Sequence, residues 1–229
     1  MEIKEDKRIA FQPLEKKVQK SIEVILEAEK RFGKENMAVA WTGGKDSTTD
    51  LSIVRTIYNG EVPFKVINVD THEMAKEVYE FRERLLKEWN LSSIIFKDVD
   101  EKKAAESKAP VDCYFLKTKA LGEGIKEHGI KAVLTGIRWD ERPSRSGEKY
   151  FSEGEGFVGV SPLLHFMEKD IWNYIKGNNI PYCALYDKGY RSLGCAPGTA
   201  ANAATGQERG DNAADREKII ENLKELGYF

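Results

Sequence analysis

The chain passes from an apolar run into two glycines and then small hydroxyl residues in Ala38-Val39-Ala40-Trp41-Thr42-Gly43-Gly44-Lys45-Asp46-Ser47-Thr48. This order is typical of a β-strand that ends in a tight turn and continues into a helix. Two glycines let backbone N–H groups turn inward toward the positive end of that helix. Lys45, Ser47 and Thr48 can add side-chain donors. The stretch therefore predicts a cradle for a phosphate group at the start of a helix.

The rest of the chain alternates between strand and helix patterns. We predict strands at 37–41, 64–70, 93–98 and 131–138, and helices at 14–32, 47–58, 73–89, 116–128 and 168–176. This alternation indicates an α/β fold with a doubly wound, mostly parallel sheet of five or six strands and helices on both faces. Ligands of such sheets bind at the carboxyl ends of the strands.

Three regions follow from the same patterns. We predict an N-terminal helical extension over 1–34, a nucleotide-binding domain over 35–197, and a flexible tail with a C-terminal helix (216–226) over 198–229. Within the central domain, the polar and glycine-rich residues 139–159 are predicted to form a mobile loop, and order resumes at 160–164.

The overall charge gives no electrostatic reason to expect a nucleic acid or an anionic membrane as partner. The 229 residues carry 36 basic and 38 acidic side chains, a net charge of −2. The N-terminus lacks the apolar core of a signal peptide, and no apolar run approaches the roughly 20 residues that span a bilayer. The three cysteines, Cys113, Cys183 and Cys195, are odd in number and widely spaced, which argues against a disulfide framework. We therefore expect a cytoplasmic protein.

The glycine loop Thr42-Gly43-Gly44-Lys45-Asp46-Ser47 resembles the PP-loop, Ser-Gly-Gly-x-Asp-Ser, of the ATP pyrophosphatases and of the phosphoadenylylsulfate reductase family. Thr42 replaces the usual serine and keeps its hydroxyl. The loop differs from a Walker A motif, which has a further glycine ahead of a four-residue gap. The resemblance implies the Rossmann-like fold of the adenine nucleotide alpha-hydrolase-like superfamily. It also implies ATP, adenylylsulfate or phosphoadenylylsulfate as the nucleotide, with Trp41 beside it.

Two further motifs carry the resemblance beyond the loop. Asp70-Thr71 resembles the Val-Asp-Thr signature that lines the adenosine pocket in this family; a strand-ending Asx turn is the alternative. Thr135-Gly136-Ile137-Arg138 matches Thr-Gly-x-Arg, where the glycine permits close approach of the nucleotide and the arginine faces phosphate or sulfate. With Arg145, this segment looks like the arginine-rich anion loop of the small subunit of sulfate adenylyltransferase. Two arginines recognise a tetrahedral oxyanion better than lysines would.

Asp46 and the segment Tyr190-Arg191-Ser192 are two further candidates for contacts with the phosphates. A carboxylate among phosphates is repulsive unless a cation intervenes, so we predict that Asp46 binds Mg²⁺; a role as N-cap of the following helix is the alternative, and both can hold at once. Residues 162–195 resemble the distal half of sulfonucleotide reductases and of eukaryotic-type FAD synthetases. Arg191 and Ser192 are predicted to close over the phosphates.

The cysteines separate the branches of the family. Iron–sulfur adenylylsulfate reductases bind their cluster through a Cys-Cys pair and a later Cys-x-x-Cys, and this chain matches those places only at Cys113 and Cys195, with Asp112 and Gly198 at the other two. Two thiolates in place of four predict that there is no iron–sulfur cluster. The reductases also use a cysteine in a Glu-Cys-Gly-Leu-His segment, whereas this sequence ends Leu-Gly-Tyr-Phe.

These observations favour adenylyl transfer from ATP to a small oxyanion, with sulfate as the first candidate and flavin mononucleotide as the second. The loop N–H groups, Lys45 and Mg²⁺ would hold the leaving pyrophosphate, while Arg138 and Arg145 would neutralise charge at the reacting phosphate and the acceptor. Two alternatives remain open: a sulfonucleotide reductase that borrows its thiol from Cys195 or a partner, and a non-catalytic nucleotide sensor. By resemblance, the expected partners are a GTPase subunit, thioredoxin or a second copy of the chain.

Overall fold

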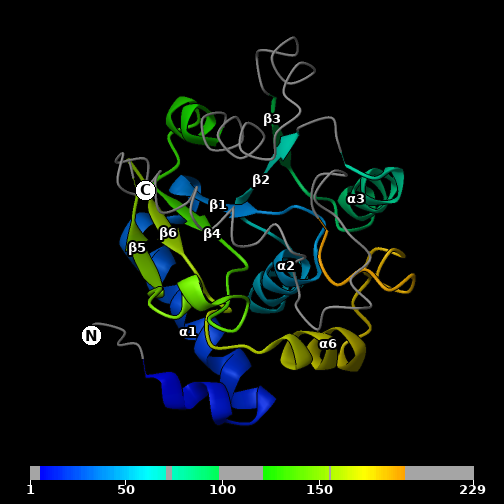
Figure 1. The fold of residues 1–229 in the computed structure, drawn as a ribbon. Coiled ribbons are helices and arrows are strands. Elements are labelled where there is room, and N and C mark those ends of the chain that lie inside the picture. Colours follow the sequence, from blue (N-terminus) through cyan, green and yellow to red (C-terminus); the bar gives the residue numbers. More distant parts are fainter. Residues whose placement is uncertain (1–5, 71–73, 98–120, 155, 194–229) are drawn as a thin grey trace.

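The computed structural model describes residues 6–70, 74–97, 121–154 and 156–193, which form an α/β fold (Figure 1). Its six-stranded sheet has the order β3-β2-β1-β4-β6-β5. The strands that run parallel to one another are β1 (Met37–Ala40), β2 (Lys65–Asp70), β3 (Ser93–Lys97), β4 (Ala132–Leu134) and β6 (Val158–Val160). The edge strand β5 (Phe151–Glu153) is antiparallel to β6. The predicted mostly parallel sheet is therefore confirmed.

Helices cover both faces of the sheet. The longer ones are α1 (Leu14–Phe32), α2 (Lys45–Ile57), α3 (Lys76–Glu88) and α6 (Glu168–Gly177). Residues 121–127 are also helical, and three short 3₁₀ turns complete the described elements: η1 (Lys7–Phe11), η2 (Lys34–Asn36) and η3 (Pro143–Arg145). One core contains side chains of α1, α2, α3 and α6, and the second contains Ile125 of the 121–127 helix.

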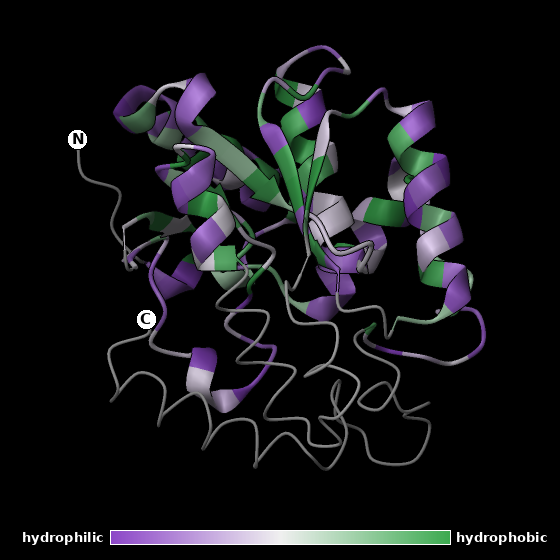
Figure 2. Ribbon diagram, turned by 90° about the horizontal axis from the view of Figure 1, so that it is seen from above, coloured by the Kyte–Doolittle hydropathy of each residue, from purple (hydrophilic) through white to green (hydrophobic). Residues whose placement is uncertain are grey.

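The central strand β1 is buried on both faces, which explains why its sequence is apolar throughout. Met37 and Val39 point into the core that contains α2, and Ala38 points into the other core; all three are fully buried. A parallel strand covered on both faces has no solvent side, so its sequence lacks the alternation of a half-exposed strand. Figure 2 shows this as hydrophobic strands between helices whose outer faces are hydrophilic.

The N-terminal helix α1 shares the core of the sheet. Its residues Val24 and Ile25 are fully buried there, and Ser21 Oγ donates a hydrogen bond of 2.8 Å to the carbonyl of Pro162. Lys17 forms a buried ion pair of 2.5 Å with Asp170 of α6. A buried pair of this kind is costly to break from one side. The division at residue 34 remains a prediction, but α1 packs as part of the described fold.

The prediction that residues 139–159 form a loop is wrong in part, because short regular elements interrupt the segment. The segment contains η3, β5 and the first two residues of β6. It is closed by a hydrogen bond of 2.9 Å from Trp139 Nε1 to the carbonyl of Glu148, and Tyr150 is fully buried with its ring centroid 6.0 Å from that of Trp139. The strands are three residues long, and β6 contains Gly159, so a search for apolar alternation misses them. Two aromatic side chains, Trp139 and Tyr150, hold the segment in place.

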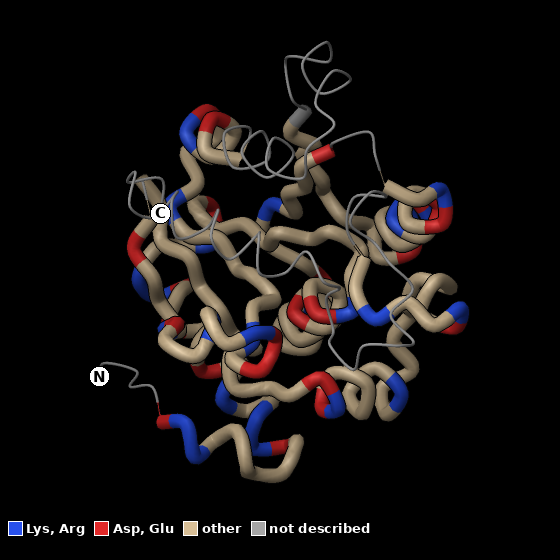
Figure 3. The backbone as a smooth tube through the Cα atoms, in the orientation of Figure 1, with Lys and Arg blue, Asp and Glu red and all other residues tan. Residues whose placement is uncertain are grey.

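The outer surface carries both charge signs. Figure 3 shows lysine and arginine interspersed with aspartate and glutamate along the helices. Among the described residues, none of the helices combines the length and apolar character needed to cross a membrane. The predicted tail and C-terminal helix, together with Thr71, Cys113 and Cys195, lie outside the described residues.

Candidate functional site

The predicted motifs meet at one edge of the sheet. The chain leaves β1 and builds β2 and β3 on one side of it, then places β4 on the other side. The loops after β1 and β4 therefore diverge at the point where the strand order reverses, where open α/β sheets bind their ligands. Helix α2 begins at this point, with its N-terminus at the carboxyl edge (Figure 1).

The glycine loop has the geometry of an anion cradle. Gly43 has φ of +82°, a conformation that favours glycine, and Gly44 is the N-cap of α2. The hydroxyls of Thr42 and Ser47 lie 3.2 Å apart, and the backbone N–H of Gly44 donates to Thr42 Oγ1 over 3.3 Å. A hydroxyl at position 42 thus stabilises the turn, which explains why threonine can replace serine here.

Trp41 and Thr48 lie beneath the cradle. Trp41 is 1% exposed and Thr48 fully buried, and the indole N–H of Trp41 donates to Thr48 Oγ1 over 3.0 Å. Of the three predicted side-chain donors, Thr48 is therefore turned toward the core. Trp41 and Thr48 therefore stabilise the glycine loop from its core side.

Gly136 brings the loop after β4 against the start of α2. A Cβ atom at Gly136 would lie 2.8 Å from the backbone nitrogen of Ser47 and 2.9 Å from the carbonyl carbon of Asp46. These are backbone atoms of a helix and cannot yield as a flexible side chain would. The glycine thus allows the two loops to touch, whereas the predicted close approach of a nucleotide at Gly136 stays a prediction.

Lys45 is almost completely buried at the first turn of α2, with 1% exposure. Its ammonium group lies 3.2 Å from Asp46 Oδ2 and donates to the carbonyl of Arg191 over 3.0 Å. Glu168 Oε1, at the start of α6, is 3.9 Å away. The position next to the loop N–H groups suits a cation that neutralises phosphate charge.

Arg138 lies between two carboxylates and is also 1% exposed. Its Nη1 donates to Asp46 Oδ1, and its Nε donates to Asp140 Oδ1 over 2.8 Å. A guanidinium held at two of its nitrogens has a fixed orientation. The structure thus brings Lys45, Asp46 and Arg138 together, as predicted, and adds Asp140 to them.

The alternative role of Asp46 as N-cap is wrong, because Gly44 is the N-cap and makes no side-chain cap bond. The predicted Mg²⁺ role stays a prediction that the geometry does not support. Each oxygen of Asp46 faces a cation, Arg138 or Lys45, and no cluster of three candidate metal-ligating side chains occurs among the described residues. In this arrangement Asp46 orients two cationic side chains.

Glu168 was missed at the sequence level. Its Oε2 accepts from Arg191 Nη2, and its backbone N–H donates to Asp140 Oδ2 over 2.8 Å. Glu168 thereby connects the predicted Arg191 to Asp140, which in turn holds Arg138. A glutamate at the first turn of a helix is common, so the sequence gave no sign of this role. Ser192 makes no hydrogen bond with a described residue, so only its neighbour joins the network.

Tyr186 was also missed. Its hydroxyl accepts a hydrogen bond of 2.8 Å from the backbone N–H of Lys45, one of the N–H groups that the cradle offers to an anion. Its ring lies 5.9 Å from the Lys45 ammonium and 5.1 Å from the ring of Trp172, measured to the ring centroids. The segment after α6 therefore covers the start of α2.

The remaining predicted residues lie at the margins of this network. Asp70 ends β2, and its Oδ1 accepts from the hydroxyl of Tyr79 over 2.8 Å. Arg145 lies in η3, where its Nη1 donates to Glu148 Oε1 over 2.8 Å. Arg145 and Arg138 thus face different carboxylates, and their joint contact with an anion stays a prediction.

Cys183 is the cysteine within the described residues. It is fully buried, and its Sγ lies 3.6 Å from the carbonyl of Glu77. Burial raises the pKa of the thiol above its usual value, which lowers the thiolate fraction at neutral pH. Cys183 is therefore a packing residue, as the sequence indicated.

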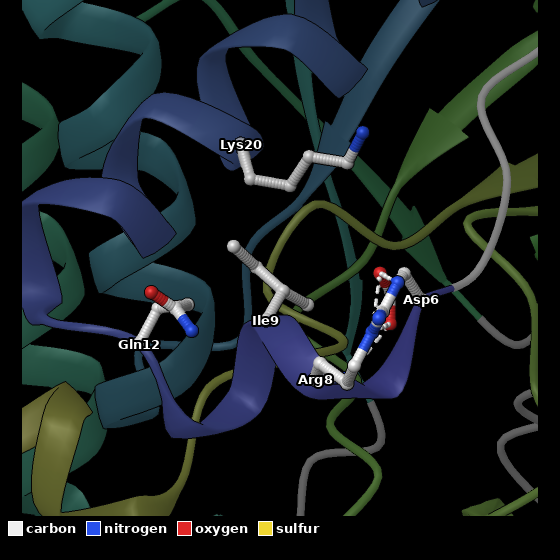
Figure 4. Close-up of a pocket in the computed structure, with 5 residues that line it drawn as sticks. All are labelled: Asp6, Arg8, Ile9, Gln12 and Lys20. Carbon is white, nitrogen blue, oxygen red and sulfur yellow. Dashed lines mark hydrogen bonds and ion pairs between the residues drawn. The ribbon is translucent and has the colours of Figure 1, made fainter.

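A cavity of about 450 Å³ lies away from this edge, where η1 approaches α1 (Figure 4). It is lined by Asp6, Arg8, Ile9, Gln12 and Lys20. Figure 4 shows Arg8 turned onto Asp6, and their ion pair measures 2.7 Å. Both charges satisfy each other at the surface, so the cavity offers little that would orient a ligand.

The sheet order and the position of the loop define an α/β protein with a Rossmann-like fold. The model of the phosphoadenosine phosphosulfate reductase domain matches residues 36–201, and the chain belongs to that family. The matched range contains all the motifs that carried the resemblance at the sequence level.

Two groups of enzymes appear among its relatives. The chain is 35% identical over 160 residues to adenosine 5'-phosphosulfate reductase 1 of Bacillus subtilis, covering 65% of this chain and 68% of the relative. It is 28% identical over 196 residues to sulfate adenylyltransferase subunit 2 of Zymomonas mobilis, covering 72% of this chain and 64% of the relative. The relatives thus include both a reductase and an adenylyltransferase subunit of sulfonucleotide metabolism.

Solved structures agree on the fold. Phosphoadenylyl-sulfate reductase from Candida auris superposes with a TM-score of 0.66 at 21% identity, over 87% of this chain and all of that one. FMN adenylyltransferase from Candida glabrata, in complex with FAD and inorganic pyrophosphate, gives a TM-score of 0.65 at 19% identity, over 96% and 77% of the two chains. These likenesses confirm the predicted fold and leave the reaction open.

Proposed function

We propose that the protein transfers the adenylyl group of ATP to a small oxyanion and releases pyrophosphate, with sulfate as the first candidate acceptor and flavin mononucleotide as the second. An oxygen of the acceptor attacks the α-phosphorus, and the bond from that phosphorus to the bridging oxygen breaks. Both bonding electrons leave with pyrophosphate, so no oxidant or reductant is needed. The acceptor is already ionised, so no general base is needed either.

One observation carries the proposal: two almost completely buried cations, Lys45 and Arg138, flank the N-terminus of α2 beside a glycine loop. Each side chain is 1% exposed. Asp46 contacts both cations, and Asp140 contacts Arg138 as well. Preorganised cations stabilise charge that develops on a leaving group without reorganisation during the reaction. Lys45 would hold pyrophosphate, and Arg138 would hold the reacting phosphate.

The sulfonucleotide reductase remains the second candidate, because the relatives include an adenosine 5'-phosphosulfate reductase. That chemistry requires a thiolate that takes sulfite from the nucleotide. Cys183 does not suit the role, since it is fully buried and its pKa is raised by burial. The reductase alternative therefore depends on Cys195, which lies outside the described residues, or on a thiol of a partner.

Pyrophosphate release tests the transferase. ATP is supplied with sulfate, with flavin mononucleotide or with no acceptor, and acceptor-dependent release is expected for one of them. Lys45→Met should lower the rate by about 100-fold, since a charged contact to the leaving group is worth about 1.5–3 kcal/mol. Lys65→Met is the matched control, because the ammonium of Lys65 donates to the carbonyl of Glu35 away from the cradle.

Two results would favour other functions. Thioredoxin-dependent sulfite release that is lost in Cys195→Ser would assign the protein to the reductases. ATP binding without turnover of any acceptor or sulfonucleotide would leave the nucleotide sensor.

A further inference from the structure

A fourth cation lies beside the glycine loop, and it differs from the other three in having no carboxylate partner within the part of the chain that the structure describes. Arg82 of α3 is 5% exposed. Among the described residues its hydrogen bonding is limited to a contact of 3.9 Å from Nη1 to the sulfur of Met74, and its buried Nε has no partner. Lys45, Arg138 and Arg191 each face a carboxylate oxygen.

The position of Arg82 is set by the loop itself. A Cβ atom at Gly43 would lie 3.0 Å from Arg82 Cγ and 3.3 Å from its Cδ, so the stem of the arginine packs directly on the turn. Gly43 also has a positive φ, and any larger residue there would displace the arginine. The glycine thus serves both the turn and the approach of Arg82.

The guanidinium continues from Gly43 toward the carboxyl end of β2. Its Nη1 contacts Met74, four residues after that strand ends, and Asp70 is the carboxylate that acts on it electrostatically. Asp70 Oδ1 is occupied by the hydroxyl of Tyr79, and no ion pair with Arg82 forms. Burial lowers the pKa of the guanidinium, with Asp70 opposing that shift.

A buried arginine with so little pairing destabilises the protein that contains it, because the desolvation of the charge is not compensated. Such a residue is expected where a ligand supplies the missing acceptor. Strands β2 and β4 flank β1 on opposite sides, so Arg82 approaches the loop from the β2 side and Arg138 from the β4 side. An anion in the cradle would be contacted from both.

We propose that Arg82 is an anion-binding residue of the nucleotide site and donates to a phosphate oxygen of ATP when the glycine loop holds that nucleotide. This inference rests on the ATP binding assumed in the proposed function and adds a residue that none of the sequence motifs contains. It also explains why Arg82 is buried with no carboxylate partner among residues 6–70, 74–97, 121–154 and 156–193, since the cost of burying it is offset on binding.

Calorimetric titration with ATP and thermal unfolding of the ligand-free protein test this together. Arg82→Met should weaken ATP binding about 10- to 100-fold, the worth of one or two hydrogen bonds from a charged group. Its melting midpoint without ATP should stay equal or rise, because the substitution removes a buried charge that no described carboxylate pairs with. Arg84→Met, on the same helix, is the control: Arg84 is an exposed residue paired with Glu88, so its affinity should match the wild type.

Two results would overturn the proposal. ATP affinity of Arg82→Met within twofold of the wild type would show that the arginine makes no phosphate contact. A lower ligand-free midpoint would assign Arg82 to the packing of α3. If the wild-type protein bound no ATP, both the proposed function and the role of Arg82 would be wrong. If the wild type bound ATP and Arg82→Met bound it equally well, only the role of Arg82 would be wrong.

Discussion

The hydroxyl of Tyr186 accepts a 2.8 Å hydrogen bond from the backbone nitrogen of Lys45, 141 residues away in the sequence. This N–H group belongs to the first turn of α2, where helix N–H groups have no intrahelical partner. A phosphate oxygen placed in the cradle would use the same donor. The ligand-free structure therefore holds a neutral hydroxyl where a bound nucleotide is expected to present an anion.

Replacing Tyr186 tests this competition. Tyr186→Phe removes the hydroxyl and leaves the Lys45 N–H available, so the affinity for inorganic pyrophosphate should rise by about two- to tenfold, the net worth of one neutral hydrogen bond. Tyr182→Phe is the matched control, because its hydroxyl donates to Asp187 outside the cradle. Calorimetric titration measures both. Weaker binding by Tyr186→Phe would instead mean that the hydroxyl turns to donate to the phosphate.

Asp140 orients Arg138, and its substitution should affect turnover. The carboxylate accepts from two donors, Arg138 Nε and the backbone N–H of Glu168, each over 2.8 Å. Asparagine offers one acceptor oxygen and an NH₂ group, so one of those donors must lose its partner. We expect Asp140→Asn to lower kcat about 10- to 100-fold with a smaller change in KM for ATP, since a displaced guanidinium acts mainly on the transition state.

A surface aspartate gives the control for that experiment. Within the described ranges Asp187 accepts from one donor, the hydroxyl of Tyr182, and Asp187→Asn keeps an acceptor oxygen for it. Steady-state kinetics of acceptor-dependent pyrophosphate release distinguish the two. Equal kcat in wild type and Asp140→Asn would remove Asp140 from the positioning of Arg138.

Gly136 should tolerate no side chain. The added methyl of Gly136→Ala would meet the backbone of Ser47 and Asp46 at 2.8 and 2.9 Å, so α2 or the loop after β4 must shift. Overpacking of this kind costs about 1–3 kcal/mol. We expect a lower free energy of unfolding in urea together with weaker ATP binding.

The paired control for this substitution is Gly177→Ala at the end of α6, where an added Cβ meets nothing within 4 Å. Alanine should leave that variant as stable as the wild type or stabilise it by about 0.5–1 kcal/mol. An unchanged unfolding curve for Gly136→Ala would contradict the close contact between the two loops.

The sequence was sufficient for the fold because each signal was local. A buried parallel strand, the glycine pair and the start of α2 all lie within residues 37–57. Contacts between distant segments could not be predicted in this way. The hydroxyl of Tyr186 contacts the backbone of Lys45 across 141 positions, and the side chain of Arg82 packs on the turn at Gly43. Strands β5 and β6 were also missed, because three residues are too few to show an alternation of apolar and polar side chains. Both strands depend on pairing, β5 with β6 and β6 with β4.

Asp50 makes the stability of the protein depend on pH. It is fully buried in α2, and neither carboxylate oxygen has a hydrogen-bond partner among the described residues. Burial raises the pKa of Asp50 from 3.8 to about 8. Between these two pH values the folded state keeps a proton that the unfolded state has lost, so the contribution of Asp50 to the free energy of unfolding is greatest at low pH and falls as pH rises toward 8.

His165 acts in the opposite direction over the lower part of that range. Burial lowers the pKa of this histidine from 6.5 to about 4, so its contribution to stability is lost as pH falls from 6.5 to 4. The effect of Asp50 is therefore best isolated between pH 6.5 and 8. One pKa unit corresponds to about 1.4 kcal/mol, so roughly 2 kcal/mol should be lost across this interval.

Urea unfolding of the wild type and of Asp50→Asn at pH 6.5 and 8 measures this loss. The wild type should lose stability between the two values and Asp50→Asn should not, since an amide has no proton to release in this range. The buried amide still lacks partners, so the variant need not be more stable at pH 6.5. Parallel pH dependence in both proteins would show that Asp50 is ionised throughout, and that another group balances its charge in the folded state.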